Sequence, residues 1–408
     1  MASAEPLLSV QEARARVLAA AVPLPAERLP SESCLGSALA QDLVADRPLP
    51  AFDNSEVDGY AVRASDLAGA LPDRPVSLPV AFELAAGEGA VRRLEAGRAA
   101  RVFTGAPLPP GADAVVMQER VRREAERAIF ETACEAGLGV RRAGEDVAAG
   151  ARALVAGSTV GPAEIALALA LGSTDLSVHR RPSVAIVTTG DELFDPGEAL
   201  PPGGIFDSNG PALAAAVRAA GATILGRHRA KDDPAALWAA LERCRGADLV
   251  LTVAGVSVGE RDYVRAALEG LGASLDFWRV AMRPGKPLAL GRWGRVPILC
   301  LPGNPVSCLV TFELFGRPLV RRLAGHREVE RPLVDAELSA AVRKPADLAF
   351  FCRGRWEDGR FTPAPRQGSG ILTSLVGQNG LAEIPPGPSE LPAGSRVRVR
   401  LLGVPELS

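Results

Sequence analysis

The sequence predicts a multidomain protein of α/β and β type, built around a doubly wound α/β domain. Three observations support this fold class. Apolar strands alternate with helical stretches over residues 181–329, short β-type runs separated by Gly and Pro fill residues 49–147, and alternating strands with many turns occupy residues 330–408. Alternation of strand and helix is typical of a parallel sheet with helices on both faces, whereas short strands with frequent turns are typical of small β domains.

Length, charge and hydropathy limit the kinds of protein that this chain can be. Its 408 residues, 47% of them hydrophobic, predict several domains with substantial cores. The net charge of −2 argues against bulk binding of nucleic acid or of anionic membranes, so an anionic ligand would need local positive groups. The longest apolar stretches, such as Ile165 to Leu171, are far shorter than the roughly 20 residues of a membrane span.

Cysteine and histidine usage predicts a cytoplasmic protein without structural zinc. The six cysteines are scattered and form no CxxC pair, no secretory leader precedes them, and none of the three histidines lies beside a cysteine pair. Positive charge comes almost entirely from arginine, because the chain has only three lysines, Lys231, Lys286 and Lys344. Lys286 lies in the motif MRPGKP, which suggests a specific role for it.

The pattern of the first half of the chain predicts a helix, then a small β-rich domain, then a second helix. Ala, Val and Leu recur at helical spacing from Val10 to Ala21, and a Pro-rich segment follows. Helical spacing returns around residues 163–171. Between these stretches, the predicted strands are 76–84, 100–104, 114–121 and 128–132.

Residues 181–329 carry the clearest pattern. The predicted strands are 183–187, 223–226, 248–253 and 297–301, and the predicted helices are 211–220, 234–243, 263–271 and 305–323. Gly221 closes one helix, and Asp233 with Pro234 opens the next. Ligands of an open parallel sheet bind beyond the carboxyl ends of its strands. The motifs TTGDE, GVSVG and PGNP all follow strands, so we expect them on one rim.

Residues 330–408, with strands such as 395–401, predict a small antiparallel barrel.

The segment Pro50 to Arg63, PAFDNSEVDGYAVR, is the most unusual of the chain. It places three carboxylates, an Asn, a Ser and a Tyr around a Gly. Asp53, Asn54 and Ser55 favour turns, and Gly59 permits backbone conformations that other residues avoid. The sequence therefore predicts a fixed surface loop that displays carboxylates for binding a cation or moving protons. An ordinary solvated turn is the alternative.

A second segment, Leu301 to Ser307 with the sequence LPGNPVS, predicts a strand, a tight turn and a helix. Asn304 occupies the expected N-cap position and Pro305 the first helical position. Free backbone amides at such a helix start attract anions. We therefore expect this turn to bind an anionic group.

Together the two segments closely resemble the molybdopterin molybdenumtransferase family, of the MoeA and gephyrin E-domain type. The resemblance extends over almost the whole chain, because further motifs follow in the family's order. These motifs are ARVFTGAPLPPGADAVVMQE (100–119), RRAGEDV (141–147), TTGDEL (188–193), FDSNG (206–210), GVSVGERD (255–262), MRPGKP (282–287) and GSGILTSLVGQNGLAEIP (368–385).

The resemblance implies a division into four domains and a homodimer. Residues 1–48 and 148–180 would form an elongated linking domain with the β-rich domain 49–147 inserted in it. Residues 181–329 would form the molybdopterin-binding-like α/β domain, and residues 330–408 a C-terminal β-barrel domain. The inserted domain would face the α/β rim of the other subunit and close a cleft between the two.

The activity implied by the resemblance is a Mg²⁺-dependent transferase reaction. Molybdate would be inserted into adenylylated molybdopterin with release of AMP, in the biosynthesis of the molybdenum cofactor. The adenylyltransferase that precedes this step is a candidate partner. The same resemblance makes Asp58 the strongest catalytic candidate, with Asp146 and Glu192 assisting through charge and metal orientation.

Asp191 and Glu192 follow a predicted strand as paired acids that could hold Mg²⁺ while waters and phosphates complete its shell. A helix N-terminus with acids complementing its dipole is the alternative, and the resemblance favours the metal. The remaining substrate-binding residues implied by the resemblance are Thr104, Gly190, Ser208, Asn209, Asp232, Gly255, Ser257, Gly259, Asp262, Pro302, Gly303, Asn304, Pro305 and Ser307.

Arg279, Arg283 and Lys286 lie around a break made by Pro284 and Gly285, and we expect them to hold a tetrahedral oxyanion. The resembling proteins commonly carry Lys where this chain has Arg279 and Arg283. A second departure is TVAG at residues 252–255, where the family usually has Ser or Thr followed by Ser-Gly-Gly. Both departures bear on whether the chain is catalytically competent.

Three alternative functions follow from the same residues. The motif GVSVG satisfies the GxSxG pattern of a hydrolase nucleophile elbow, with Ser257 as nucleophile and with Asp276 and His326 downstream. The two departures would also suit a paralogue that binds the adenylylated pterin without turning it over. Finally, tungstate has the shape and charge of molybdate, so a tungstate-inserting variant is the nearest alternative.

Overall fold

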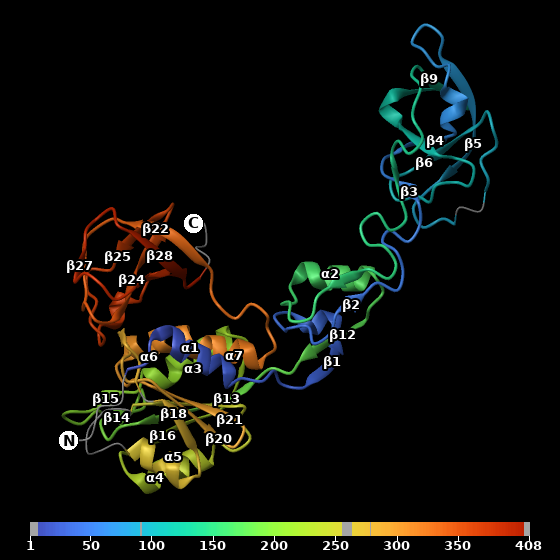
Figure 1. Cartoon of the computed structure of the whole chain (residues 1–408). Helices are drawn as coiled ribbons and strands as arrows, with labels where there is room; N and C mark the ends of the chain where they lie inside the picture. The colour runs from blue at the N-terminus through green and yellow to red at the C-terminus, as the bar shows by residue number, and fades with distance from the viewer. Residues whose placement is uncertain (1–6, 90–91, 255–262, 278, 404–408) are drawn as a thin grey trace.

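Figure 1 shows the computed structural model, which describes residues 7–89, 92–254, 263–277 and 279–403 as an elongated chain. An α/β body and a β-barrel lie at one end, a linking body lies in the middle, and a β-rich body lies at the far end. The predicted fold class is confirmed. Four predicted site residues, Gly255, Ser257, Gly259 and Asp262, lie outside the described residues.

The linking body is made of two-stranded pairings and one helix, and α1 (Val10–Ala19) precedes it. Ser9 and Glu12 form a capping box at the start of α1, whose buried Ala13 and Val17 pack into the core of the α/β body. The antiparallel pairs are β1 (Ala26–Pro30) with β12 (Asp175–His179) and β2 (Leu43–Val44) with β11 (Arg152–Leu154), and α2 spans Pro162–Ala170.

The β-rich body contains a six-stranded sheet in the order β7-β4-β6-β5-β9-β8. Its strands are β4 (Gly59–Val62), β5 (Val76–Leu84), β6 (Ala99–Val102), β7 (Ala114–Met117), β8 (Val121–Glu124) and β9 (Arg127–Phe130), and β3 (Asn54–Ser55) pairs with β10 (Val140–Arg141) beside it. The prediction of a surface loop over residues 50–63 is therefore only partly right. Asn54 and Ser55 are buried in a strand, and every residue of β4 is buried.

The predicted reason for Gly59 is wrong, because Gly59 is not among the residues with positive φ. Glycine is needed there because a Cβ atom would collide with the backbone carbonyl oxygen of Val116 on the neighbouring strand β7. Close approach of two backbones, and not a turn conformation, fixes this position.

We expect Gly59→Ala to destabilise the β-rich body by about 1–3 kcal/mol, as an overpacked core position does. Urea unfolding of the variant measures the loss in the free energy of unfolding, and a thermal scan measures the accompanying fall in the midpoint temperature. Gly69→Ala is the matched control in the same body, since only the Arg74 guanidinium, at 3.9 Å, lies near its Cβ position. Equal stability of the two variants would contradict the packing argument.

The α/β body is built on a six-stranded sheet in the order β16-β13-β17-β21-β20-β18. The first four strands are parallel. β20 runs antiparallel to β21, and β18 runs antiparallel to β20 and therefore in the direction of the first four strands. The predicted parallel sheet therefore contains one reversed strand, β20, next to its edge. The bounds are β13 (Ser183–Thr189), β16 (Thr223–Ala230), β17 (Leu249–Val253), β18 (Ser274–Phe277), β20 (Ala289–Trp293) and β21 (Val296–Leu301).

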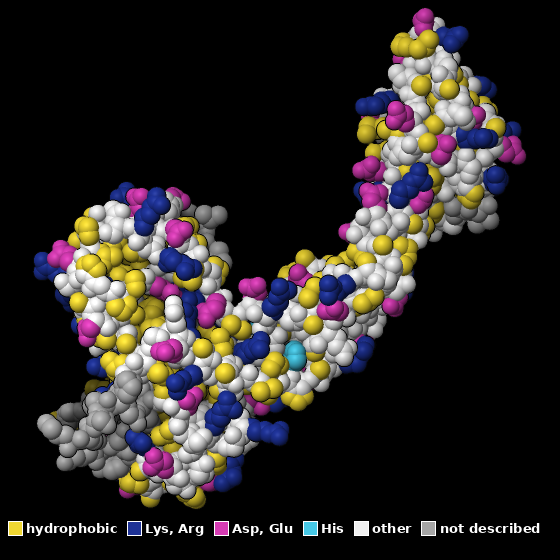
Figure 2. All heavy atoms as spheres, viewed as in Figure 1, with side chains coloured by type: hydrophobic (Ala, Val, Ile, Leu, Met, Phe, Trp, Pro, Cys, Tyr) yellow, Lys and Arg dark blue, Asp and Glu magenta, His cyan; other side chains and the backbone are white. Residues whose placement is uncertain are grey.

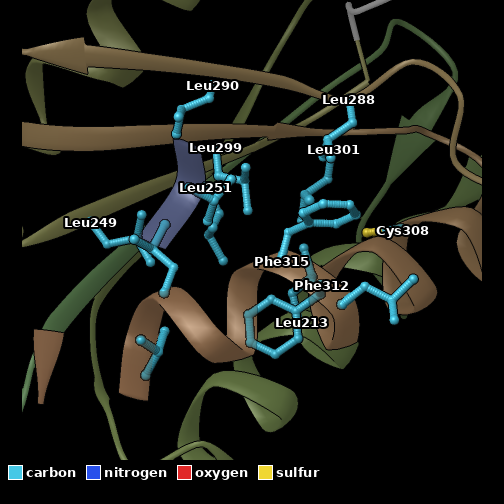
Figure 3. Close-up of a cluster of buried hydrophobic side chains, with 14 of the residues drawn as sticks. Leu213, Leu249, Leu251, Leu288, Leu290, Leu299, Leu301, Cys308, Phe312 and Phe315 are labelled. Atoms are coloured by element: carbon cyan, nitrogen blue, oxygen red, sulfur yellow. The ribbon is translucent and has the colours of Figure 1, made fainter. Parts of the chain in front are cut away.

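Helices cover both faces of this sheet (Figure 1). One face carries α3 (Asn209–Ala219), α6 (Pro305–Thr311) and α7 (Arg317–Leu323), and the other carries α4 (Pro234–Glu242) and α5 (Tyr263–Gly270). Figure 3 shows the core of the first face, where leucines of the strands meet Phe312 and Phe315. These two residues belong to a π-helical turn, Phe312–Gly316, inside the helix predicted for residues 305–323.

The C-terminal body is a closed barrel, as predicted, but with one parallel pairing. β24 (Ala349–Glu357), β25 (Arg360–Pro363), β22 (Leu333–Leu338), β28 (Arg396–Leu401) and β26 (Gly380–Ile384) follow one another, and β26 pairs back to β24. All of these pairs are antiparallel except β22 with β25. The short β23 (Val342–Arg343) and β27 (Glu390–Leu391) pair with each other beside it.

The barrel is fastened to the α/β body by strand pairing and by charge. β19 (Met282–Arg283) pairs in parallel with β24. The buried guanidinium of Arg400 forms ion pairs with Glu330 and Glu383, and Arg14 of α1 binds the same Glu330 at 2.8 Å. Because Arg400 is 1% exposed, these carboxylates are needed to offset its desolvation. The network fixes how the barrel faces the sheet.

Charges of both signs are mixed on the surface. Figure 2 shows Lys and Arg side chains interspersed with Asp and Glu side chains over the visible face. Across the described residues, no helix is long and apolar enough to cross a membrane.

A buried histidine lies where the linking body meets α7. His326 is 1% exposed, and its Nδ1 lies 2.9 Å from the Thr159 hydroxyl. Burial, together with nearby Arg321 and Arg317, lowers the pKa of His326 to about 4. The folded protein therefore holds this ring neutral.

This histidine predicts acid sensitivity. An unfolded histidine titrates near 6.5, so between about pH 6.5 and pH 4 the unfolded chain binds more protons than the folded one. The contribution of this neutral ring to the free energy of unfolding is therefore fully present above about pH 6.5. About 3 kcal/mol of it is lost as the pH drops to about 4. We expect the thermal midpoint to fall less between neutral and acidic pH in His326→Gln than in the wild type. An equal fall in both proteins would contradict the assignment.

Candidate active site

The first cleft lies at the carboxyl ends of β13, β17 and β21, where the sequence predicted a shared rim. It has a volume of about 450 Å³. A flap formed by β14 (Leu193–Phe194) and β15 (Ile205–Phe206), which pair in parallel, supplies one part of its lining. The predicted residues that line this cleft are Glu192, Ser208, Asn209, Pro302, Gly303, Asn304 and Pro305.

Hydrogen bonds hold the polar part of this cleft in place. The carboxylate of Asp207, which is 5% exposed, accepts bonds from the Thr188 hydroxyl at 3.0 Å and from the Gly210 amide at 2.9 Å. The side-chain amide of Asn209 donates to the carbonyl of Gly303 at 2.7 Å, which joins the start of α3 to the PGNP turn. Asp207 was not singled out from the sequence, although it belongs to the FDSNG motif.

The acidic TTGDE segment forms a turn after β13, so the alternative of a helix N-terminus is wrong. Glu192 lines the cleft. A Cβ at Gly190 would lie 2.7 Å from the Glu192 carboxylate, so this glycine makes room for it. Asp191 accepts a bond from the Asp232 amide at 3.2 Å, and the Asp232 carboxylate accepts one from Thr189 at 2.8 Å. Gly190, Asp191, Glu192 and Asp232 are thus brought together.

The PGNP turn is partly covered by the barrel. Asn304 occupies the N-cap position of α6 but makes no side-chain cap bond, and Pro305 is the first helical residue. The Val306 amide, which we expected to be free for an anion, donates to the carbonyl of Ser369 at 3.1 Å. Ser307 is 4% exposed and does not line the cleft. The prediction of a row of free amides here is therefore wrong at Val306.

A second cleft, of about 520 Å³, lies between the α/β body and the barrel. It is lined by Arg283, Arg343, Lys344, Pro345, Phe350, Gln367 and Gly368. Lys344 is 6% exposed, and its ammonium donates to the carbonyl of Pro345 at 3.0 Å. Arg343 pairs with Glu390 at 3.1 Å. The lining is strongly basic and contains no acidic residue within the described part of the chain.

Arg353 lies behind this lining, and no carboxylate among the described residues pairs with it. It is fully buried, its Nε donates to Ser374 at 3.1 Å, and its Nη2 donates to the Gly368 carbonyl at 3.4 Å. Among the described residues, its Nη1 has no hydrogen-bond partner. Burial lowers the pKa of the Arg353 guanidinium, and the charge of Arg283 lowers it further. An anion in the cleft would offset this cost.

The sequence-based prediction for the basic residues is only partly met. Arg283 lines the second cleft, but Arg279 and Lys286 line neither of the two clefts. Arg279 is half-buried, and its carbonyl accepts a bond from Leu8, whereas the Lys286 side chain is exposed. Sequence reasoning missed Lys344 and Arg353, and the scarcity of lysine in this chain was the one available signal for Lys344.

The β-rich body presents the remaining candidates. Asp58 Oδ1 accepts bonds from the Thr104 amide at 2.8 Å and from its hydroxyl at 2.7 Å. These two bonds, followed by the charge of Arg101, lower the pKa of Asp58. Asp146 is exposed, and its amide donates to the carbonyl of Leu49. In one chain this body lies far from the α/β rim (Figures 1 and 2).

The structure does not favour the serine hydrolase alternative. Asp276 forms a surface ion pair with Arg16 at 2.9 Å, while His326 is buried against Thr159. The two residues have separate partners and form no dyad. The proposed nucleophile, Ser257, lies outside the described residues.

Family models match three consecutive parts of the chain. The MoeA N-terminal region (domain I and II) matches residues 8–172, a probable molybdopterin binding domain matches residues 185–322, and the MoeA C-terminal region (domain IV) matches residues 335–402. Molybdopterin molybdenumtransferase 2 of Mycobacterium tuberculosis is 41% identical over 379 residues, which cover 91% of this chain and 94% of that protein. The chain belongs to the MoeA family of molybdopterin molybdenumtransferases.

Other relatives support the same membership. The molybdopterin molybdenumtransferase of Synechococcus elongatus is 39% identical over 390 residues, covering 94% of this chain and 96% of that protein. Among solved structures, a molybdopterin biosynthesis MoeA protein from Pyrococcus horikoshii has a TM-score of 0.86 at 29% identity, over 97% of this chain and all of that one. The resemblance seen in the motifs is thereby confirmed.

Proposed function

We propose that this protein inserts molybdate into adenylylated molybdopterin and releases AMP, as a step of molybdenum cofactor biosynthesis. The observation that carries the proposal is the pair of adjoining clefts. Arg283 lines the basic cleft and Pro287 the first one, so the MRPGKP loop separates them. Relatives named molybdopterin molybdenumtransferase support the same reaction.

The basic cleft would hold the oxyanion. The planar guanidinium of Arg283 offers hydrogen-bond donors at the edge of the cleft. Lys344 adds a nearly buried positive charge, and the buried Arg353 raises the positive potential behind both residues. The first cleft would hold the pterin nucleotide, with Asn209 and the PGNP turn positioning it. Holding two anions side by side, away from water, contributes the orientation and electrostatics that the transfer requires.

Mg²⁺ would be held beside the first cleft by Asp191 and Glu192. Two carboxylates can suffice for this ion, because Mg²⁺ usually keeps several waters and takes phosphate oxygens from its substrate. When bound, Mg²⁺ would supply positive charge that stabilises the departing phosphate. Glu192, lodged in the space that Gly190 leaves open, would orient this ion at the cleft.

A homodimer would complete the site. Asp58, Thr104 and Asp146 lie at the far end of the same chain, so they reach a cleft only if the cleft belongs to a second subunit. Because its pKa is lowered, Asp58 stays ionised at neutral pH and would act as a fixed negative charge. The substrate itself must be made by an adenylyltransferase, which is a candidate partner.

Incubating the protein with adenylylated molybdopterin, molybdate and Mg²⁺ tests the proposal. We expect release of AMP that depends on molybdate and is lost when Mg²⁺ is chelated. Tight binding of the adenylylated pterin without AMP release would identify a non-catalytic binding protein instead. Faster turnover with tungstate than with molybdate would identify the tungstate-inserting variant.

A further inference from the structure

We infer that Ile205 and Phe206 form an apolar wall on which a planar heteroaromatic ring of the substrate stacks. The inference rests on the proposed function, because it assigns a part of the first cleft to one part of the pterin nucleotide. It names the pterin or the adenine ring as the ligand group, since both are flat, heteroaromatic and bear polar edges.

Exposure and position single out these two side chains. Ile205 is 53% exposed and Phe206 is 44% exposed, and both line the first cleft. Large apolar side chains that remain open to water inside a concave polar site usually meet a ligand. Three prolines, Pro287, Pro302 and Pro305, also line the cleft and add flat apolar surface.

Polar groups lie beside the wall, as an amphipathic ring requires. Asp207 and Ser208 follow Phe206 directly, and both line the same cleft together with Asn209. Stacking fixes the plane of a ring, and polar side chains at its edge fix its rotation. A phosphate or molybdate alone would leave the apolar wall without any contact.

The wall is braced from behind, so it does not need to be ordered by the ligand. The Arg229 guanidinium lies over the ring of Phe194 at 5.9 Å and pairs with Glu198 at 2.9 Å. On the flap itself, the Ile205 amide donates to the Glu192 carbonyl at 2.7 Å, and a Cβ at Gly204 would lie 2.9 Å from the Phe194 ring. Strand pairing and close packing therefore hold Ile205 and Phe206 in place.

A matched residue in the loop between β14 and β15 separates the effect of exposure from that of ligand contact. Leu200 is 46% exposed, nearly the same as Phe206, but it does not line the cleft. Leu200→Ala therefore removes a comparable amount of exposed apolar surface from this loop without touching the proposed wall.

The experiment compares binding of two ligands by calorimetry under anaerobic conditions. AMP carries the adenine ring alone, and molybdopterin without adenylate carries the pterin ring alone. We expect Phe206→Ala to weaken binding of one of them by about ten- to a hundredfold, the range for loss of one stacked ring. We expect Phe206→Trp to restore binding and Leu200→Ala to leave it unchanged. The ligand that is weakened identifies the ring.

The contrary outcomes are distinct. If the wild type binds both ligands and both Phe206→Ala and Ile205→Thr bind them equally well, the wall is overturned while the proposed function stands. If Phe206→Ala dissociates a dimer without changing either Kd, the residue is a subunit contact, and the wall is again overturned. If the wild type binds neither ligand, the proposed function falls, and the wall falls with it.

Discussion

Replacing Asp58 with Asn is expected to lower kcat for AMP release by about 10²–10³, the usual effect of removing one electrostatic group from an active site. The change isolates charge from structure. An asparagine oxygen can still accept the two bonds that Thr104 donates to Asp58, so the loop keeps its conformation. Because Asp58 is held ionised, the loss is that of a fixed negative charge.

Asp66→Asn is the matched control for this variant. Asp66 lies in the same β-rich body and accepts a single bond, from the Gly97 amide at 2.8 Å. It should retain full activity. Wild-type turnover by Asp58→Asn would remove the catalytic assignment.

Mixing two impaired variants, at a molybdate concentration well below the KM of Arg283→Gln, tests whether the site is shared between subunits. Asp58→Asn and Arg283→Gln damage opposite ends of the chain, so a heterodimer would contain one intact site and one doubly damaged site. Random exchange of subunits would then restore about a quarter of wild-type activity, since half the dimers are mixed and each has one working site. No recovery after proven exchange would argue that each site is made by one chain.

The sequence located the first cleft well because the rule that places it is topological. Side chains that follow parallel strands must meet at one edge of the sheet, so Glu192 and Gly303 could be grouped without coordinates. Asn209, in contrast, was implied only by the family resemblance. The short strands β18 and β20 were missed, and with them the antiparallel direction of β20, because a short strand carries no mark of its direction in the sequence.

The second cleft could not be found in this way. Arg283 and Lys344 are about sixty residues apart in the chain, and they meet only because β19 pairs with β24 of the barrel. Neither a motif nor periodicity reports such a pairing. Arg353 resembles any other strand residue in the sequence, and only its burial and its unpartnered Nη1 reveal its importance.

The polar residues Asn54 and Ser55 were predicted to lie in a surface loop, whereas both are buried. Turn-forming side chains usually lie at the surface, but here their polar groups are satisfied by nearby backbone. The Ser55 hydroxyl donates to the Val57 carbonyl, and the Asn54 amide donates to the Phe52 carbonyl at 3.2 Å. Once these bonds are made, both side chains can be buried.

Replacing Arg283 with Gln is expected to raise the KM for molybdate by about ten- to a hundredfold with kcat nearly unchanged at saturation. The estimate follows from the loss of one charge-assisted hydrogen bond, about 1.5–3 kcal/mol. Lys344 and Arg353 remain in the variant, so the cleft stays basic but loses its donor at the lip. Steady-state AMP release at varied molybdate concentration measures both constants.

Arg283→Lys separates charge from geometry at the same position. A compact ammonium should restore most of the affinity because it keeps the positive charge, although Lys cannot form the bidentate contact of Arg. Arg355→Gln is the matched control, because Arg355 is an exposed arginine of the same barrel that pairs with Glu357 at 3.7 Å. If KM stays at the wild-type value in Arg283→Gln while kcat falls, Arg283 acts on the transition state and not on the bound oxyanion. If neither constant changes, molybdate does not enter by the basic cleft.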